Sequence, residues 1–386
     1  MEQRPTWRNL QRREGPPFLD WLAATNQVDL HLRRLADELV AFLTDQIQAP
    51  DDAEAFWNAI PAVREECNRP EIYDLFMHSE AYAYVHLLDR YWRTWEALQE
   101  LLRHNLLPMG DEGVRLLDVG TGPAPTPYGI QDFYEVIRRY GDEHDLPGLR
   151  SQRVDTMVIE RSASMARLMH HFSEFTGRPG PFGSDRTDFV DFSPKREREA
   201  LYSQRLSELY EMEESEPGFY FFTDDPNDEV QRHLRFRFVV LSNFLTIGDA
   251  VRTFEKPLYE LFSDLQPGAV AMVLSARGNQ YETIHEDLRV LVEKCRMYEV
   301  QGPATVLGGN TYAEVAAIVK QAQYRVYTHV ESLATVDLPR TRRFPDYWSP
   351  EPYPGKRPEF ALRVYRKGRW RRIAGSQVAP VSYEAE

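Results

Sequence analysis

Apolar residues in the first part of the chain recur every three or four positions. The run Leu30, Leu32, Leu35, Leu39 and Phe42 has this spacing, and a wider apolar stripe lies between residues 71 and 106. A stripe of that width is stable only when it is buried against a neighbouring element. The pattern predicts a helical region over residues 1–107. Three roles fit it: a lid over a pocket, a dimer interface, or packing behind a sheet.

Beyond residue 107 the pattern changes to short apolar runs separated by amphipathic stretches. We expect strands at 114–119, 156–160, 236–241, 269–275, 324–330 and 360–365, a weaker strand near 187–192, and helices at 128–139, 163–175, 257–265, 280–297 and 311–322. Strands that alternate with helices predict an α/β protein with a mostly parallel sheet and right-handed crossovers.

Two charged stretches interrupt this alternation. Residues 206–230 hold nine Asp or Glu and no Lys or Arg, which is typical of a solvated insertion, here at about 194–232. Residues 340–372 have the opposite balance, with eleven Lys or Arg against three acidic residues. We therefore divide the chain into the helical region, a second domain over 108–372 and a tail over 373–386.

The net charge of the chain is −14, from 60 Asp plus Glu against 46 Lys plus Arg. A field of this sign repels phosphate backbones, so nucleic acid would have to bind locally, through the basic stretch 340–372. The two cysteines, Cys67 and Cys295, provide neither a disulfide framework nor a zinc site, and we expect no metal. Without a secretory signal or an apolar run of about 20 residues, we expect a cytoplasmic protein with no membrane partner.

The strand predicted at 114–119 includes Asp118 and runs into the turn Gly120-Thr121-Gly122. Glycine has no Cβ and lets the backbone lie close to a bound nucleoside, while the start of the next helix offers free N–H groups. Glu160 ends the following strand, where a carboxylate can accept hydrogen bonds from ribose hydroxyls. This order of elements indicates a ligand that contains a nucleoside.

Four segments resemble motifs of the class I S-adenosylmethionine (SAM)-dependent methyltransferase family. LLDVGTGPA at 116–124 is similar to the first motif, with Ala124 where a glycine is common, and VIERSASM at 158–165 is similar to the second. FVVLSNFL at 238–245 resembles the fourth-strand motif, and LQPGAV at 265–270 resembles the turn into strand five. The resemblance covers about residues 108–366. It implies a Rossmann-like, mostly parallel seven-stranded sheet flanked by helices, with SAM as the cofactor.

A dinucleotide-binding oxidoreductase is the competing interpretation of the glycine turn. Three prolines, Pro123, Pro125 and Pro127, follow the turn closely. They suit a rigid, irregular loop better than the immediate helix start of a dinucleotide site. The span from the turn to Glu160 is also longer than the usual length of about 20 residues, with residues 141–153 as the excess.

The resemblance to the methyltransferases also implies roles for particular residues. Gly120 and Gly122 would approach the amino acid part of SAM, with Asp118 and Thr121 anchoring the turn, and Glu160 would bind the ribose. The remaining implied cofactor contacts are Arg161 beside that acid, Met165 near the adenine, and either Asp188 or Asp191 at the adenine amino group. Ser242 and Asn243 would lie beside the sulfonium and the acceptor.

Candidate catalytic residues follow the later strands. His285, with Tyr281 nearby, follows the strand at 269–275, on the sheet edge where ligands enter open α/β folds, and is a candidate general base. Asn243 is a candidate for orienting an acceptor amine. The sequence after it lacks the prolines of the Asn-Pro-Pro-aromatic motif, which argues against a DNA base methylase.

Together these features predict a SAM-dependent methyltransferase that acts on a small molecule by in-line methyl transfer to oxygen or nitrogen. Two alternatives remain open. One is an RNA- or ribosome-associated methyltransferase that uses the basic stretch 340–372. The other is a catalytically silent methyltransferase-like subunit that serves as an interaction platform.

Overall fold

The computed structural model describes residues 7–65, 69–110, 113–178, 188–203, 234–276, 279–300, 305–307, 313–335 and 359–368. The tail over 373–386, the acidic part of the expected insertion and most of the basic stretch 340–372 lie outside these residues. Within the described residues, no helix is both long enough and apolar enough to cross a membrane.

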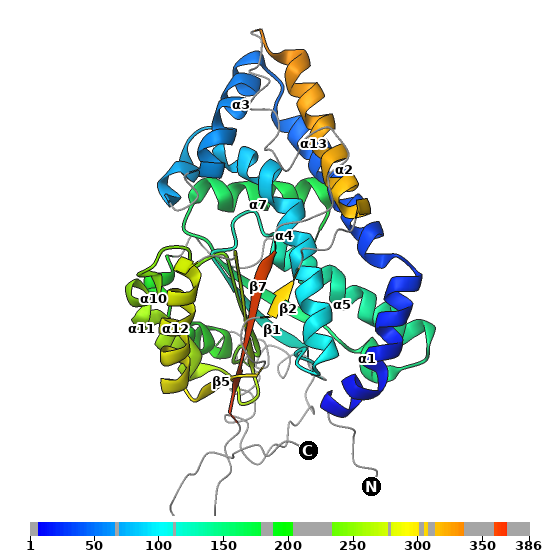
Figure 1. Cartoon of the computed structure of the whole chain (residues 1–386), viewed down its shortest axis with the longest axis vertical. Coiled ribbons are helices and arrows are strands. Elements are labelled where there is room, and N and C mark those ends of the chain that lie inside the picture. Colours follow the sequence, from blue (N-terminus) through cyan, green and yellow to red (C-terminus); the bar gives the residue numbers. More distant parts are fainter. Residues whose placement is uncertain are drawn as a thin grey trace, which may run out of the picture.

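A seven-stranded sheet is formed by the described residues and lies at the centre of the molecule (Figure 1). The strands follow the order β2 (Val154–Ile159), β1 (Val114–Val119), β3 (Phe238–Ser242), β4 (Val270–Ala276), β7 (Phe360–Lys367) and β5 (Met297–Glu299), with β6 (Thr305–Leu307) also paired to β7. The first four strands are parallel, and β7 is antiparallel to its neighbours. The predicted α/β, Rossmann-like class with a mostly parallel sheet is confirmed.

Side chains that alternate along the strands enter two separate cores. Leu116 and Met272 point into a core shared with α1 (Trp7–Ala24), α4 (His78–Arg103) and α5 (Pro125–Glu143). Leu117 and Ala271, their immediate neighbours in sequence, point into a core shared with α10 (Ala250–Thr253), α11 (Glu255–Asp264) and α12 (Asn279–Lys294). Because β1 and β4 are buried on both faces, their sequences read as continuous apolar runs rather than as alternating ones.

A helical layer lies beyond one end of the sheet and occupies the upper part of Figure 1. It contains α2 (Gln27–Gln46), α3 (Pro50–Glu65), α7 (Ala163–Thr176) and α13 (Ala313–Leu333). Helix α13 packs along α2 and also contacts α4, where the Gln323 side chain donates to the Tyr84 carbonyl at 2.9 Å and the Tyr84 hydroxyl donates back to the Gln323 carbonyl. The layer therefore joins segments from both halves of the chain.

Two sequence predictions for the sheet were wrong. Residues 324–330, expected to form a strand, belong to the second half of α13. The region near 187–192, expected to form a weak strand, instead includes the short 3-10 helix η2 (Phe189–Asp191). Conversely, β5 and β6 were not predicted, since each spans three residues and is defined mainly by pairing with β7. The excess residues before Glu160 are the end of α5 and the short helix α6 (Pro147–Arg150).

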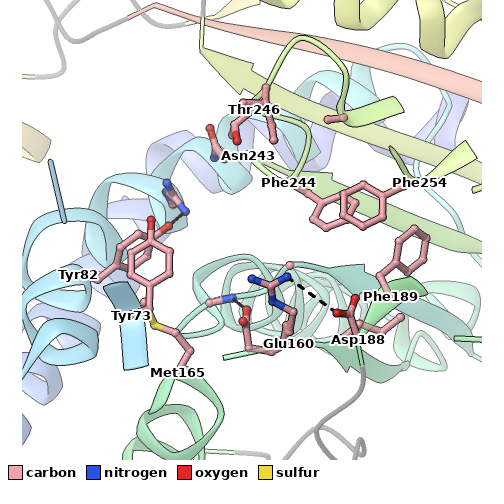
Figure 2. A pocket seen from close by; sticks show the side chains of 17 residues that line it. Tyr73, Tyr82, Glu160, Met165, Asp188, Phe189, Asn243, Phe244, Thr246 and Phe254 are labelled. Carbon is pink, nitrogen blue, oxygen red and sulfur yellow. Dashed lines mark hydrogen bonds and ion pairs between the residues drawn. The ribbon is translucent and has the colours of Figure 1, made fainter. Parts of the chain in front are cut away.

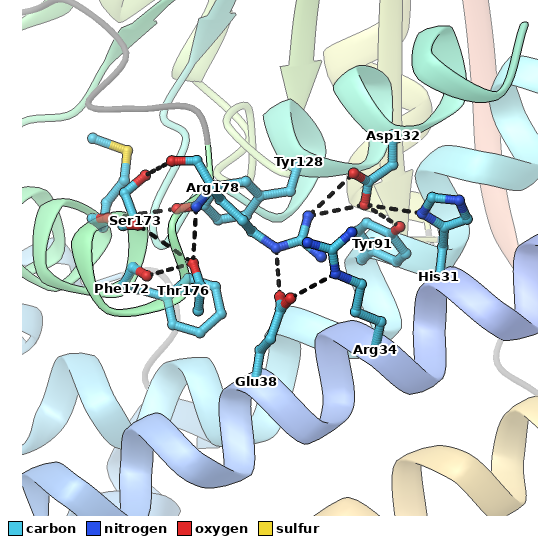
Figure 3. A network of polar contacts seen from close by, with 11 residues as sticks. His31, Arg34, Glu38, Tyr91, Tyr128, Asp132, Phe172, Ser173, Thr176 and Arg178 are labelled. Atoms are coloured by element: carbon cyan, nitrogen blue, oxygen red, sulfur yellow. Dashed lines mark hydrogen bonds and ion pairs between the residues drawn. The ribbon is translucent and has the colours of Figure 1, made fainter. Parts of the chain in front are cut away.

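A buried polar network ties α2 to the helices beside the sheet (Figure 3). Arg178, just beyond α7, donates from Nη1 to Asp132 of α5 at 2.9 Å and from Nε to Glu38 of α2 at 2.5 Å. The Tyr91 hydroxyl of α4 donates to the same Asp132 carboxylate at 2.6 Å. The Arg178 side chain is 3% exposed, so its charge is balanced by these two carboxylates rather than by water.

Lys367, at the end of β7, is expected to be a strong determinant of stability. Its buried ammonium donates to the carbonyls of Phe262 and Ser263 in the last turn of α11, and to the carbonyl of Cys295 just after α12. Lys367→Met would leave these carbonyls without donors, and we expect a loss of about 3 kcal/mol in the free energy of unfolding, measured by urea denaturation. The exposed Lys294→Met is the control and should change it by less than about 0.5 kcal/mol. A similarly small change for Lys367→Met would contradict this role.

Candidate functional site

The candidate site lies where the chain reverses direction across the sheet. Strand β1 sits between β2 and β3, so the chain leaves β1 to one side and later returns on the other. In open α/β sheets, ligands bind in the crevice outside the carboxyl ends of the strands at such a switch point. The glycine turn begins at the carboxyl end of β1, directly in this crevice.

The backbone of this turn needs conformations that favour glycine. Gly120 has φ +69° and Gly122 has φ +59°, and Ala124, which precedes α5, has φ +61°. A Cβ on Gly120 would lie 2.6 Å from the Phe244 ring, so this glycine is required by the protein's own packing. A Cβ on Gly122 would lie 3.5 Å from the Tyr82 ring, which is ordinary van der Waals contact, and Gly122 itself lines the cavity. A larger side chain at this glycine would therefore crowd both the Tyr82 ring and the cavity.

Glu160 connects the end of β2 to the glycine turn. Its Oε2 accepts a hydrogen bond at 2.7 Å from the backbone amide of Gly122, which lies 38 residues earlier in the sequence. Its Oε1 accepts a hydrogen bond at 2.8 Å from the backbone amide of Ser162. Burial raises the pKa of Glu160, although these amide donors oppose the shift. Each carboxylate oxygen has a second lone pair, so the side chain keeps acceptor capacity toward the cavity.

Asp118 lies behind the turn and is almost fully buried. Its Oδ1 has no partner within hydrogen-bond distance among the described residues, although the Thr121 hydroxyl and the Arg90 guanidinium lie close enough to stabilise the carboxylate. Burial raises the pKa of Asp118 to about 7. An acid in this state is stabilised by a cation or a donor close to the turn.

A cavity of about 200 Å³ opens in front of these residues (Figure 2). Three phenylalanines form one wall, with ring centroids 5.4 Å apart for Phe189 and Phe244 and 4.8 Å apart for Phe244 and Phe254. Beside this wall, Arg161 approaches Asp188 at 3.9 Å. Aromatic faces next to a hydrogen-bonding edge suit a planar heterocycle.

The helical region supplies the opposite wall. Tyr73 of η1 (Pro70–Asp74) and Tyr82 of α4 pack edge to face with centroids 5.0 Å apart, and Arg90 of α4 lines the same cavity. Asp74 holds this wall to the sheet, since its carboxylate accepts from the Ser162 hydroxyl at 2.9 Å and the Ser164 amide at 3.0 Å. Helix α4 thus both packs against the sheet and faces the cavity.

The structure brings most of the predicted cofactor residues together. Those that line the cavity are Gly120, Gly122, Glu160, Arg161, Met165, Asp188 and Asn243. Asp118, Thr121 and Ser242 are buried and are not among the lining residues. Asn243 has φ +53°, and its backbone N–H donates to the Leu274 carbonyl at 2.8 Å.

The two other candidate catalytic residues do not line the cavity. His285 is buried, with Nε2 3.0 Å from the Ser275 hydroxyl of β4, and Nδ1 has no partner among the described residues. Burial and the nearby Arg363 charge lower the pKa of His285 to about 4, so the imidazole is neutral at pH 7. Tyr281 packs against the core on the α12 side of the sheet. No role in the proposal below depends on either side chain.

The sequence interpretation missed several lining residues, mostly aromatic: Tyr73, Tyr82, Arg90, Phe189, Phe244, Thr246, Ile247, Ala250 and Phe254. Those after β3 follow directly on Asn243, so proximity to the predicted fourth-strand motif was an available signal. No comparable signal marks the residues of α4, because a helical stripe of aromatics usually indicates core packing. Among the described residues, no group of three or more His, Cys, Asp or Glu is arranged to hold a metal ion.

No family model and no curated protein matches the chain. Solved structures with a similar chain path include a protein provisionally assigned as a sarcosine dimethylglycine methyltransferase from Galdieria sulphuraria, with 12% identity, TM-score 0.35 and coverage of 71% of this chain and 85% of that one. A SAM-dependent methyltransferase from Methanosarcina mazei has 12% identity and TM-score 0.30, covering 69% and 96%. Precorrin-6y C5,15-methyltransferase from Geobacter metallireducens has 8% identity and TM-score 0.34, covering 72% and 88%. At these values the likeness says nothing about the activity of this chain.

Proposed function

We propose that this chain is a SAM-dependent methyltransferase that acts on a small molecule and transfers a methyl group to oxygen or nitrogen by in-line displacement. The observation that carries the proposal is the cavity at the switch point of the sheet, which is bordered by the bare backbone of Gly122 and the Glu160 carboxylate. The sequence motifs support the same ligand independently.

The residues present fit SAM. Glu160 has lone pairs left for the ribose hydroxyls after accepting two backbone amides. Asp118 has a buried oxygen without a partner just behind the turn, where a positively charged ligand would stabilise its ionised form. When bound, SAM supplies a methyl group on a sulfonium centre that is open to in-line attack.

The chain's own side chains would then orient the reactants and exclude water. The phenylalanine wall of Phe189, Phe244 and Phe254 offers apolar faces to the adenine, and Asp188 offers an acceptor to its amino group. Asn243 and Thr246 line the part of the cavity beyond β3 and are placed to orient an acceptor. Catalysis by alignment of the two reactants needs no strong base for an amine nucleophile.

A small acceptor is favoured by the apolar lining of this cavity. Among the described residues that line it, only Arg90 and Arg161 are cations, whereas a site for a nucleic-acid strand depends on several phosphate contacts. The test uses SAM labelled in the methyl group and two acceptor pools from a cell extract, one below about 1 kDa and one of purified RNA. Transfer into RNA alone would overturn the small-molecule proposal.

The cofactor itself is tested by titration calorimetry with SAM and S-adenosylhomocysteine. We expect one site per chain with a dissociation constant of roughly 1 μM–1 mM, the range of ordinary enzyme substrates. Absence of binding to both ligands would remove the methyltransferase proposal. Binding without transfer to either pool would favour the catalytically silent interaction subunit.

Glu160→Gln tests the carboxylate at the cavity. The amide keeps the shape of the side chain but turns one acceptor oxygen into a donor that faces a backbone N–H or a ribose hydroxyl. We expect S-adenosylhomocysteine to bind about 10- to 100-fold more weakly, the effect of one charge-assisted hydrogen bond. Glu174→Gln, an exposed acid on α7, should leave affinity unchanged. Equal affinities for Glu160→Gln and the wild type would mean that the ribose is held elsewhere.

A further inference from the structure

A second groove, of about 250 Å³, lies between α2 and α5 and shares no lining residue with the cavity at the switch point. Both helices pack against α4, whereas direct contact between them is sparse, so a gap remains between their facing sides. One wall of the groove is a single stripe of α2, made of Gln27, Leu30, His31 and Arg34 at helical spacing. The groove therefore offers ligand contacts that the proposed methyltransferase site does not use.

Two of these α2 side chains are largely buried and still have polar atoms to offer. Gln27 is 2% exposed, and its side-chain amide forms no hydrogen bond within the described residues. The His31 ring is held in place, because it packs on Trp95 with centroids 5.5 Å apart and its Nδ1 lies 3.7 Å from the Asp132 carboxylate (Figure 3). Buried polar groups are nearly always paired in folded proteins, so an unpaired amide in a groove indicates a bound ligand or water.

The two arginines of the groove are already ion-paired, one on each helix. Arg34 donates from Nε to Glu38 at 2.8 Å, and Arg139 of α5 donates from Nε to Glu143 at 2.9 Å. Neither acid lines the groove. Within the part of the chain that the structure describes, the Nη nitrogens of both guanidiniums have no acceptor. Each guanidinium is thus oriented by its ion pair and keeps donors with which arginine binds a carboxylate.

Glu135 supplies the opposite charge on the α5 side of the groove. Its carboxylate is exposed and forms neither an ion pair nor a hydrogen bond with the described residues. Its free oxygens suit an ammonium group. Leu30, which is 54% exposed, and Val136 add apolar surface to the same groove, and an apolar group gains free energy by covering it.

These groups match a zwitterion better than a simple anion. A phosphate or a dicarboxylate gains most from cations without a counter-ion, and both arginines of the groove have one. A ligand with one carboxylate and one ammonium brings no net charge, and it uses both the free Nη donors and the free oxygens of Glu135. The smallest common molecules with these two groups and an apolar body are amino acids.

We propose that the groove between α2 and α5 is a binding site for a free amino acid with an apolar side chain. Its carboxylate binds the Nη groups of Arg34 and Arg139, its ammonium binds Glu135, and its side chain covers the apolar residues of the groove. This site goes beyond the proposed function and does not depend on it. An amino acid bound there is a ligand in addition to the methyl donor and the acceptor.

The test screens the common free L-amino acids against the full chain by thermal shift and titrates the best binder by calorimetry. We expect an apolar amino acid to raise the unfolding midpoint and to bind with a dissociation constant of roughly 10 μM–1 mM, as befits so small a ligand. Its carboxamide lacks the carboxylate and its N-acetyl form lacks the ammonium, so each should bind at least about 10-fold more weakly. Absence of binding by every amino acid would overturn the proposal, as would equal affinity for the free amino acid and either derivative.

Two substitutions at exposed positions assign these contacts and should leave the chain folded. Arg139→Gln should weaken binding of the free amino acid about 10-fold and remove most of the discrimination against the carboxamide, while the discrimination against the N-acetyl form stays. Glu135→Gln should do the reverse. The controls, Arg325→Gln and Glu174→Gln, remove an exposed cation and an exposed acid outside the groove and should leave every affinity unchanged.

Unchanged affinity in both groove variants would overturn the proposal. Displacement of the amino acid by S-adenosylhomocysteine would then locate it in the cavity at the switch point instead. Because S-adenosylhomocysteine is titrated separately, a failure of the groove site is distinct from a failure of the proposed function.

Discussion

Gly122→Val is expected to abolish most SAM binding while the chain remains folded. The added side chain would begin 3.5 Å from the Tyr82 ring and would enter the cavity that Gly122 lines. Overpacking of a ligand site by two or three carbon atoms weakens binding on the order of 100-fold. The measurement is calorimetric titration with S-adenosylhomocysteine, together with a denaturation curve for each variant.

Gly177→Val is the control for backbone strain in this experiment. Gly177 follows α7 and has φ +65°, close to the +59° of Gly122, and a Cβ there would have no atom within 4 Å. Each variant should lose about 1–3 kcal/mol of stability from the left-handed conformation, but only Gly122→Val should lose the ligand. Gly120→Val is a poorer test, because its side chain would collide with Phe244. Unchanged affinity in Gly122→Val would mean that no ligand lies against the turn.

Arg178→Met is expected to be among the most destabilising single substitutions in the described part of the chain. It would leave the buried Asp132 and Glu38 carboxylates without their shared cation, and breaking a buried pair in this way costs about 3–5 kcal/mol. The comparison is Arg325→Met, which removes the exposed pair with Asp37 and should change stability by less than about 0.5 kcal/mol. Urea denaturation of both variants at pH 7 measures the difference. A loss below about 1 kcal/mol for Arg178→Met would show that the network is not a stabilising element.

The same network predicts how stability depends on pH. Burial alone would raise the pKa of Asp132, but hydrogen bonds from His31 and Tyr91 and the charge of Arg178 outweigh it and hold the pKa below its usual value. A carboxyl whose pKa is lowered by folding stabilises the protein above its unfolded-state pKa of about 4, and this contribution is lost as the pH falls through the folded-state value. In Arg178→Met the lowering should shrink, so the acid-side loss of stability should begin at a higher pH.

The sequence was most informative where one physical constraint dominates. β1 and β4 were predicted close to their observed bounds because strands buried on both faces must be apolar throughout. The glycine turn and Glu160 were placed together because the positive φ values at Gly120 and Gly122 exclude most other residues. Local constraints of this kind depend on a few neighbouring residues and can therefore be recognised in the sequence.

Predictions failed where tertiary contacts determine the secondary structure or the position of a side chain. Residues 324–330 contain Tyr324, Val326, Tyr327 and Val330, whose β-branched and aromatic side chains favour a strand in isolation. In the structure, Val326, Tyr327 and Val330 continue a helical apolar face that begins at Val315 and packs against α2. The cavity residues of α4, Tyr82 and Arg90, could not be identified for a related reason: whether they line the cavity depends on which side of α4 meets the sheet, and only the assembled fold determines that.

The packing of α13 on α2 has a consequence for the order in which the molecule can assemble during synthesis. Helix α2 ends at Gln46, but its partner starts only at Ala313. At about 5–20 residues per second, a ribosome needs tens of seconds to bridge that gap. Throughout this interval the part of the apolar face of α2 that α13 covers stays exposed in the nascent chain, although α4 and α7 can already pack against the rest of it.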